Sequence, residues 1–330
     1  MAGKAYADEE KAKNTIHLKG LLEQLPPFCY TYFRGISQTT SVKTRMGYAY
    51  DLKVFFGFLC AEHKDFKGVK FEDIRPEDLE MVNSEDIEEF LDYVSIYSPY
   101  NDEDGICGKE TILNSESAKA RKLAAVRSMY KYYLRKGYIS TDPAALVDKP
   151  KIHDKNIIRL EANEVANLLD EVETGENLTE RQQKFHEKTK IRDLAIITTL
   201  VGTGIRVSEC VGLNIDDINF DNFSFVITRK GGKEAEIYFG DEVAEALSDY
   251  LVYRKAHPPV DENDKSLFLS NRGKRISVRQ VELMVKKYAQ TAVKTKKITP
   301  HKLRSTYGTT LYQETGDIYL VADVLGHKDV

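Results

Sequence analysis

Residues 223–239, FSFVITRKGGKEAEIYF, hold two short runs in which apolar and polar side chains alternate, one on each side of Gly231-Gly232. Alternation places every second side chain on one face of an extended chain, and a glycine pair between two such runs is typical of a tight turn. The stretch therefore predicts a β-hairpin. The chain on both sides has helical periodicity instead, so we expect a mostly helical domain with one small sheet.

The predicted helices of this domain lie before and after the hairpin in the sequence. In residues 190–201 the run LAIITTLV is apolar throughout, which predicts a buried helix. The other segments with apolar side chains at three- and four-residue spacings are residues 158–172, 241–256, 278–292 and 302–314. Residues 158–330 therefore predict a mixed α+β domain.

The first 150 residues predict a purely helical domain with a short N-terminal extension. Amphipathic spacing predicts helices over residues 44–60, 84–97 and 117–138, and residues 101–116 predict a polar loop. Residues 151–157 belong to a polar linker that follows Pro150. The predicted fold class is mainly α with a small β-sheet, in two domains.

Length and composition agree with two soluble domains. The chain has 330 residues, 42% of them hydrophobic and 30% charged, and its formal net charge is -4. The start, MAGKAYADEEKAKN, is too acidic for a signal peptide, and no apolar run approaches the roughly 18 residues of a membrane span. Four cysteines without a CxxC pair suggest neither a disulfide framework nor a zinc ribbon. We expect a reduced, cytoplasmic protein with no membrane partner.

The near-neutral balance hides blocks of like charge. Residues 72–104 contain 13 acids and one base, residues 119–136 contain seven bases and no acid, and residues 272–304 contain 11 bases and one acid. Two basic surfaces separated by acidic ones could bind a polyanion locally without a high overall isoelectric point. The alternative is that each block is only a solvated helix face.

Four short segments after residue 200 carry residues suited to phosphate chemistry. GTGIRVSECVGLNIDDI (residues 202–218) contains Arg206 and Glu209, and TRKGGK (residues 228–233) contains Lys230 and Lys233. HKLR (residues 301–304) places His301 and Arg304 one helical turn apart, and LGHKDV ends the chain with His327 after a glycine.

Each of these residues also has an ordinary structural explanation. Arg206 could simply pair with Glu209, hairpin lysines are usually solvated, and helix histidines are usually core residues. As a set, two arginines, a lysine and two histidines suit a pentacoordinate phosphate, whose non-bridging oxygens gain charge during the reaction. Guanidinium groups bind such oxygens bidentately, and a lysine or histidine can protonate the leaving oxygen.

These motifs resemble those of the tyrosine recombinase (integrase) family, which includes Xer-like chromosome-dimer resolvases and the integrases of phages and other mobile elements. ATGLRxSE-, KGxK-, HxLR- and LGH-type motifs occur there in this order. Residues 44–59 (TRMGYAYDLKVFFGFL) and 117–144 (SAKARKLAAVRSMYKYYLRKGYISTDPA) also look like the family's core-binding, SAM-like domain. The resemblance covers nearly the whole chain and implies a site-specific DNA recombinase.

The resemblance also implies roles for the residues that match. Arg206 and Arg304 would clamp the scissile phosphate, and Glu209 would support Arg206. Lys230 would be the general acid on the leaving 5′ oxygen, with Lys233 a weaker candidate, and His301 and His327 would assist proton transfer. The family requires no metal or other cofactor, and it acts on duplex DNA as a homotetramer. We expect DNA contacts from basic and polar residues in both domains: Lys43, Arg45, Lys122, Arg127, Lys131, Arg272, Lys274, Arg279 and Gln280.

The family's nucleophile is a tyrosine that forms a 3′-phosphotyrosyl intermediate. It falls roughly nine residues beyond the LGH histidine, and this sequence stops three residues after His327. We therefore expect a truncated chain that is a monomer in solution and binds DNA but cannot cleave it. Tyr307, Tyr312 and Tyr319 are better interpreted as core or surface aromatics. Two alternatives stay open: a type IB topoisomerase-like enzyme, and a non-catalytic DNA-binding regulator on a recombinase scaffold.

Overall fold

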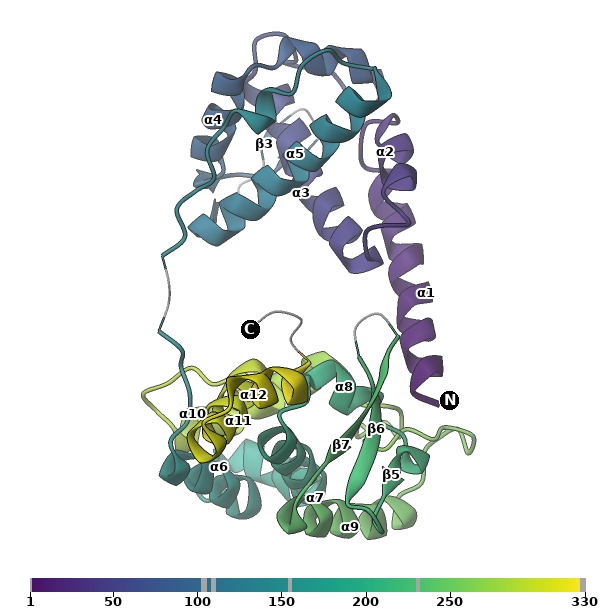
Figure 1. Cartoon of the computed structure of the whole chain (residues 1–330), viewed down its shortest axis with the longest axis vertical. Helices are drawn as coiled ribbons and strands as arrows, with labels where there is room; N and C mark the ends of the chain where they lie inside the picture. Colours follow the sequence, from purple (N-terminus) through teal and green to yellow (C-terminus); the bar gives the residue numbers. More distant parts are fainter. Residues whose placement is uncertain (1, 102–105, 108–110, 154–155, 230–231, 327–330) are drawn as a thin grey trace. The chain divides into compact units, whose positions relative to one another are not determined.

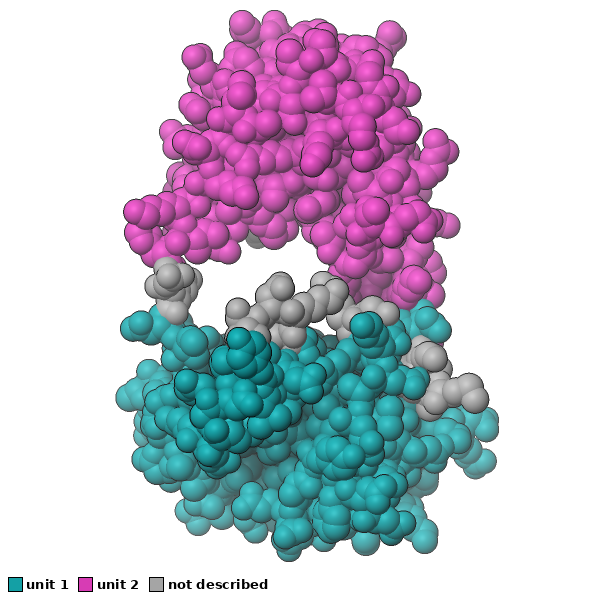
Figure 2. Space-filling model, viewed as in Figure 1, with its two compact units in different colours: residues 1–8, 155–330 teal, residues 9–154 magenta. Residues whose placement is uncertain are grey.

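The computed structural model describes residues 2–101, 106–107, 111–153, 156–229 and 232–326 of the chain. The chain forms two compact units, which Figure 2 shows in different colours. We call Glu9–Asp154 the N-terminal unit, and Lys155–Val330 together with Met1–Asp8 the C-terminal unit. The boundary falls within the predicted linker, and the first eight residues group with the C-terminal unit.

The N-terminal unit is built mainly from helices (Figure 1). Its α-helices are α1 (Ala2–Leu22, which begins in the other unit), α2 (Cys29–Gly35), α3 (Val42–Glu62), α4 (Ser84–Tyr93) and α5 (Glu116–Lys136). Short 3-10 helices are η1 (Phe71–Asp73), η2 (Pro76–Met81) and η3 (Pro143–Ala145). Two antiparallel ladders of two residues each pair β1 (Ile96–Tyr97) with β4 (Ile112–Leu113), and β2 (Tyr100–Asn101) with β3 (Ile106–Cys107).

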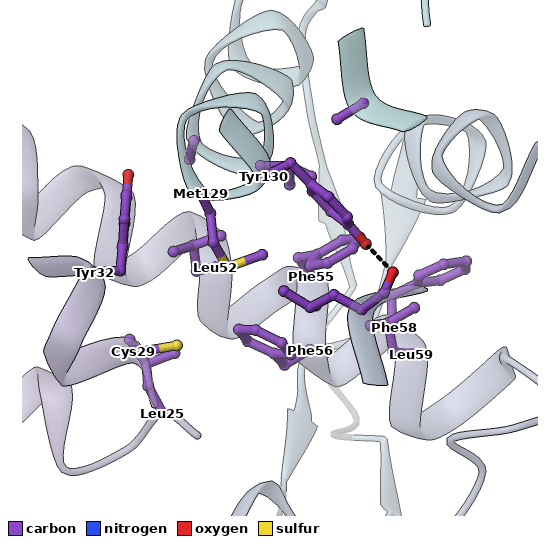
Figure 3. Packing of buried hydrophobic residues seen from close by; sticks show 14 of the residues in the cluster. Leu25, Cys29, Tyr32, Leu52, Phe55, Phe56, Phe58, Leu59, Met129 and Tyr130 are labelled. Atoms are coloured by element: carbon purple, nitrogen blue, oxygen red, sulfur yellow. Dashed lines mark hydrogen bonds between the residues drawn. The ribbon is translucent and has the colours of Figure 1, made fainter. Parts of the chain in front are cut away.

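The core of this unit is rich in aromatic side chains (Figure 3). Phe55 packs edge to face against Phe56 within α3 and against Phe90 of α4. Burying rings of this size supplies most of the apolar area that stabilises a small helical domain. The buried hydroxyl of Tyr130 donates a hydrogen bond to the Leu79 carbonyl at 3.2 Å, and that of Tyr133 donates to the Phe28 carbonyl at 2.8 Å. These two bonds tie α5 to η2 and to the chain just before α2.

The C-terminal unit combines seven α-helices with one antiparallel sheet among its described residues (Figure 1). The helices are α6 (Ala162–Thr174), α7 (Glu180–Thr203), α8 (Val207–Gly212), α9 (Asp241–Ala256), α10 (Val278–Ala292), α11 (Pro300–Thr315) and α12 (Ile318–Leu325). The 3-10 helix η4 (Ile215–Asp217) leads into the sheet, whose strand order is β5 (Ile218–Asn219), β6 (Ser224–Thr228), β7 (Glu234–Tyr238).

The predicted hairpin is confirmed. Strands β6 and β7 pair in antiparallel register from Ser224–Tyr238 to Thr228–Glu234. Phe225 and Ile237 are buried on one face of the sheet while Val226 is exposed on the other, as the alternation requires. The mainly helical fold class with a small sheet is likewise confirmed, and α9 and α10 match their predictions residue for residue.

Several predicted boundaries are wrong for identifiable reasons. The helix predicted over residues 190–201 begins ten residues earlier, because Thr179 and Gln182 form a capping box before a polar first half without apolar periodicity. The helix predicted over 158–172 begins at Ala162, since the Leu160 N–H donates to the Thr306 hydroxyl at 2.9 Å.

Two further errors lie in the N-terminal unit. The helix predicted over residues 84–97 ends at Tyr93, where the Asn114 side-chain amide donates to the Val94 carbonyl at 2.7 Å and the chain turns into β1. The loop predicted over residues 101–116 contains β3 and β4, whose two-residue ladders are too short to give a periodic signal.

Candidate active site

The turn between α7 and α8 positions Arg206. Gly204 ends α7 with a φ of +62°, and a β-carbon there would lie 2.3 Å from the Tyr307 ring, so only glycine fits. The backbone N–H of Arg206 donates to one carboxylate oxygen of Glu209 at 2.7 Å, and its guanidinium donates to the other at 2.8 Å. The Glu209 side chain is 4% exposed and the Arg206 side chain 36%. Glu209 thus orients Arg206 and leaves part of the guanidinium open to a ligand.

Arg304, on α11, lies beside the same turn. Its guanidinium donates to the Gly204 carbonyl at 2.6 Å and to the Leu325 carbonyl at the end of α12, and the residue is 5% exposed. Burial, followed by the positive charge of Arg206, lowers the pKa of Arg304 to about 10, while the Glu209 carboxylate acts in the opposite direction. Two guanidinium groups held this close favour binding of an anion between or beside them.

The HKLR turn presents its two basic side chains differently. His301 is exposed in the first turn of α11, whereas Arg304 is buried one turn later. The sequence predicts that the two side chains share a helix face, and the structure separates them by burial. The imidazole is therefore accessible from solvent while the guanidinium is fixed by the protein.

Sequence reasoning missed Arg229, which directly follows β6. Its guanidinium donates to the Asp323 carbonyl at 3.1 Å and the Val324 carbonyl at 2.7 Å, both in the last turn of α12. Its charge also contributes to lowering the pKa of Arg304. The available signal was the basic residue next to Lys230 in TRKGGK, which we interpreted only through its lysines.

Two members of the predicted set, Lys230 and His327, lie outside the described residues. Lys233 is exposed, and its backbone carbonyl accepts a hydrogen bond from the Arg229 N–H at 2.7 Å. Within the described chain, the structure therefore brings Arg206, Glu209 and Arg304 together and adds Arg229 to them.

The three upstream tyrosines occupy different environments. Tyr307 is half-buried against the Gly204 turn, and burial raises the pKa of its hydroxyl. Tyr312 and Tyr319 are 47% and 73% exposed on α11 and α12. Tyr307 thus packs on the turn that positions Arg206, and the other two are surface aromatics.

The four residues of the C-terminal unit from which we expect DNA contacts are all exposed. Arg272 and Lys274 lie on an exposed turn, and Arg279 and Gln280 lie exposed in the first turn of α10. The Gln280 side-chain carbonyl accepts the Ser277 N–H at 3.0 Å as part of the capping box, which leaves its amide N–H groups for a ligand. Arg279 lies 3.5 Å from Glu282, an exposed pair that costs little to break.

The predicted contacts of the N-terminal unit divide into exposed and internally bonded groups. Lys43 and Lys131 are exposed, and Arg45 is half-buried. Lys122 is 5% exposed with its ammonium 3.6 Å from Asp51, and burial lowers its pKa. The Arg127 guanidinium donates to the Ala144 carbonyl at 2.9 Å and to the Val147 carbonyl. The internal bonds of Lys122 and Arg127 hold their charges within the unit.

A surface hollow on α5 collects basic side chains. It has a volume of about 310 Å³ and is lined by Arg127, Lys131 and Lys149 together with four α5 residues, Ala120, Leu123, Ala124 and Ser128. Basic side chains around a surface hollow are suited to contacts with backbone phosphates.

Neither a cluster of metal ligands nor a candidate membrane span is found among the described residues. Among them, no three His, Cys, Asp or Glu side chains are grouped closely enough to hold a metal ion. No helix in the described part of the chain has the length and apolar character needed to span a membrane.

The C-terminal unit is mainly helical with a small antiparallel sheet, and it holds the guanidinium groups of Arg206 and Arg304 beside the turn between α7 and α8. Paired guanidinium groups of this kind are suited to binding an oxyanion. The family model described as "Phage integrase family" matches residues 158–330. The chain belongs to this family, and it is a tyrosine recombinase.

Curated relatives are similar in sequence to this chain along most of its length. It is 35% identical over 305 residues to tyrosine recombinase XerC of Caldanaerobacter subterraneus subsp. tengcongensis, which covers 91% of this chain and 78% of that protein. It is 33% identical over 252 residues to tyrosine recombinase XerC of Thermodesulfovibrio yellowstonii, covering 74% of this chain and 80% of that protein.

Solved structures show the same fold at low sequence identity. The XerH site-specific recombinase bound to its difH substrate has a TM-score of 0.61 at 20% identity and covers 88% of this chain and 74% of that one. A lambda integrase tetramer bound to a Holliday junction has a TM-score of 0.62 at 16% identity and covers 92% of this chain and 77% of that one.

Proposed function

We propose that this protein recombines DNA at specific sites, with Arg206 and Arg304 holding the scissile phosphate of each strand. The observation that supports this proposal is the arrangement of the two guanidinium groups. Glu209 orients Arg206, and the Gly204 and Leu325 carbonyls hold Arg304 beside the same turn. Because the protein fixes both groups in advance, they stabilise the charge that develops on phosphate oxygens without reorganising during the reaction.

The proposed reaction is two transesterifications. A tyrosine hydroxyl attacks phosphorus and gives its proton to a base, His301 or water. The bond from phosphorus to the 5′ oxygen breaks, and Lys230 gives a proton to that oxygen as it leaves. The product is a 3′-phosphotyrosyl link and a free 5′ hydroxyl. A 5′ hydroxyl of the partner strand then attacks the phosphotyrosine and returns a proton to Lys230, and the tyrosine oxygen leaves and takes back its proton from the same base. Atoms and charge balance without any cofactor.

His301 and His327 would hydrogen-bond the phosphate and assist the proton transfers. The exposed imidazole of His301, on the first turn of α11, is accessible to a DNA phosphate. The nucleophilic tyrosine would lie roughly nine residues after His327, outside the 330 residues here. We accordingly propose that these 330 residues bind DNA and form no covalent link by themselves.

Duplex DNA would be contacted by basic and polar residues of both units that are exposed or half-buried. In the C-terminal unit these are Arg272, Lys274, Arg279 and Gln280. In the N-terminal unit, Lys43, Arg45 and the hollow with Lys131 are the main candidates. Lys122 and Arg127 would contribute mainly through their electrostatic potential unless their internal bonds open.

The assembly that recombines DNA would be a homotetramer. The lambda integrase structure with the same fold is a tetramer on a Holliday junction, and exchanging strands between two duplexes requires four cleavage sites. The 330 residues alone would be monomeric in solution and bind DNA with weak cooperativity.

The test is a suicide substrate with a nick beside the cleavage point, incubated with the 330-residue chain and with the reading frame continued past Val330. We expect binding by both and a denaturant-stable DNA adduct only from the longer protein. An adduct from the 330-residue chain, mapped to Tyr307, Tyr312 or Tyr319, would overturn the assignment of the nucleophile. Sequence-specific binding without any adduct from the longer protein would favour the non-catalytic regulator, although Arg206, Glu209 and Arg304 are all in place.

A further inference from the structure

The residue that follows β6 is fixed by both its backbone and its side chain. The N–H of Arg229 donates to the Lys233 carbonyl at 2.7 Å, and its carbonyl accepts the Gly232 N–H at 3.0 Å. Its guanidinium donates to the Asp323 and Val324 carbonyls. Four hydrogen bonds on one residue are unusual for a hairpin end, where long basic side chains are normally solvated.

The partner of this guanidinium is the C-terminal end of α12. The last carbonyls of a helix lack intrahelical donors and carry the negative end of its dipole. Here arginines bond three successive ones: Arg229 takes those of Asp323 and Val324, and Arg304 takes that of Leu325. The end of α12 is thus held jointly by a residue of the hairpin and a residue of the phosphate-binding pair.

The glycine that ends α12 makes room for this contact. Gly326 has a φ of +62°, and a β-carbon there would lie 2.1 Å from a terminal nitrogen of Arg229. Any other residue would be strained in its backbone and would displace the guanidinium. The positive φ favours glycine here, and the short distance shows how closely the Arg229 guanidinium approaches the end of α12.

We propose that Arg229 is a positioning residue of the active site: it holds the end of α12 against the end of β6, and thereby keeps the Leu325 carbonyl where Arg304 binds it. The proposal rests on the proposed function. Without Arg229, the end of α12 would lose two of its three arginine bonds, and Arg304 would lose a fixed partner. Loss of Arg229 would also affect the placement of two predicted catalytic residues, because Lys230 directly follows Arg229 and His327 directly follows Gly326.

The test compares Arg229→Ala and Arg229→Lys in the recombinase that includes the nucleophile, with Arg181→Ala, an exposed arginine of α7 in the same unit, as the matched control. Binding and single-turnover cleavage are measured separately on the suicide substrate. We expect Arg229→Ala to cleave about tenfold to a hundredfold more slowly, since misplacing a group by about 1 Å has effects of this size. DNA affinity should change less than about threefold, lysine should restore part of the rate, and the control should match the wild type.

Hydrogen exchange supplies a second measurement that does not need cleavage. In the 330-residue chain, Arg229→Ala should speed exchange in peptides from α12 about tenfold or more and leave α9 and α10 unchanged. If the alanine variant does not fold, the lysine variant is compared with the wild type in both assays, and a slower rate at equal affinity is again expected.

Three results would overturn the proposal. Cleavage at the wild-type rate by Arg229→Ala would show that the contact does not matter for the chemistry. Equal losses of affinity and rate in both variants would show that Arg229 binds DNA directly. Unchanged exchange in α12 would show that the helix end is held without it. Failure of the wild type to cleave would refute the proposed function instead, and the exchange result would still stand.

Discussion

The side chains of Arg127 in the N-terminal unit and Arg304 in the C-terminal unit make the same kind of hydrogen bonds. Each guanidinium donates to two backbone carbonyls, at the end of η3 for Arg127 and at two helix ends for Arg304. They differ in their surroundings. Burial and then the nearby charges of Arg206 and Arg229 lower the pKa of Arg304, and the Glu209 carboxylate acts in the opposite direction.

This difference shows that a basic residue can either stabilise the fold or bind an anion, and that a run of basic residues in the sequence does not tell the two apart. The blocks at residues 119–136 and 272–304 look alike in sequence, and each contains both exposed bases and bases bonded inside their unit, such as Arg127 in the first and Arg275 in the second. A guanidinium whose backbone carbonyl partners satisfy it stabilises the fold. Guanidinium groups that the protein holds close together despite their mutual repulsion favour the binding of an anion.

The largest expected effect is on catalysis at Arg304. In the recombinase that includes the nucleophile, Arg304→Ala should lower the cleavage rate about 10²–10³-fold, the usual effect of losing one donor to transition-state charge, about 3–4 kcal/mol. DNA binding, spread over many phosphates, should fall only modestly. Adduct formation on the suicide substrate and gel-shift affinity measure the two effects. Equal large losses in both would make Arg304 structural, like Arg127, and the contrast between the two arginines would disappear.

A second effect concerns the buried Asp51 beside Lys122. Arg121 lies 2.7 Å from its carboxylate, but burial outweighs both cations and raises the pKa of Asp51 from an ordinary 3.8 to about 6. The folded state therefore retains a proton that the unfolded chain has already lost, so the free energy of unfolding should fall as pH rises from about 4 to 6.

Asp51→Asn should remove this dependence, which is on the order of 2 kcal/mol across the window. Urea unfolding of the 330-residue chain at several pH values measures it, and Asp65→Asn, at an exposed position, is the control. A wild-type stability that rises more steeply with pH than that of Asp51→Asn would mean that the ion pairs with Arg121 and Lys122 dominate instead.

A third effect tests the structural role of Arg127. Arg127→Ala leaves the Ala144 and Val147 carbonyls without this donor, so the free energy of unfolding should fall by about 1–3 kcal/mol. Chemical denaturation measures the loss, and Lys131→Ala, whose side chain is exposed one turn away, should leave stability unchanged. Reduced DNA affinity at full stability would instead assign Arg127 to the DNA surface.

The smallest expected effect is on DNA affinity at Lys131. Lys131→Ala should weaken binding a few-fold on all sequences alike and reduce the slope of log affinity against log salt by about 1, as expected for one phosphate contact. Binding titrations of the 330-residue chain at several salt concentrations measure the slope. An unchanged slope would remove the hollow on α5 from the DNA surface.

Local patterns predicted much of the fold because they depend on neighbouring residues. Alternation around the glycine pair predicted β6 and β7, and apolar spacing predicted α9 and α10 to the residue. The same approach failed at the start of α7, where a capping box rather than an apolar stripe begins the helix. It also failed at β1 and β4, which exist only because the two segments meet in space.

The sequence alone determined the family, because GTGIRVSE, HKLR and LGH occur in the family's order, and it nominated Arg206, Glu209 and Arg304. Only the tertiary structure decided which basic residues are exposed, since burial of Lys122 depends on Asp51 from another helix. It alone revealed Arg229, because the bond to α12 joins residues 94 and 95 positions apart in the chain. Helix-end carbonyls attract cations from any part of the fold, and no local pattern shows which cation will reach them.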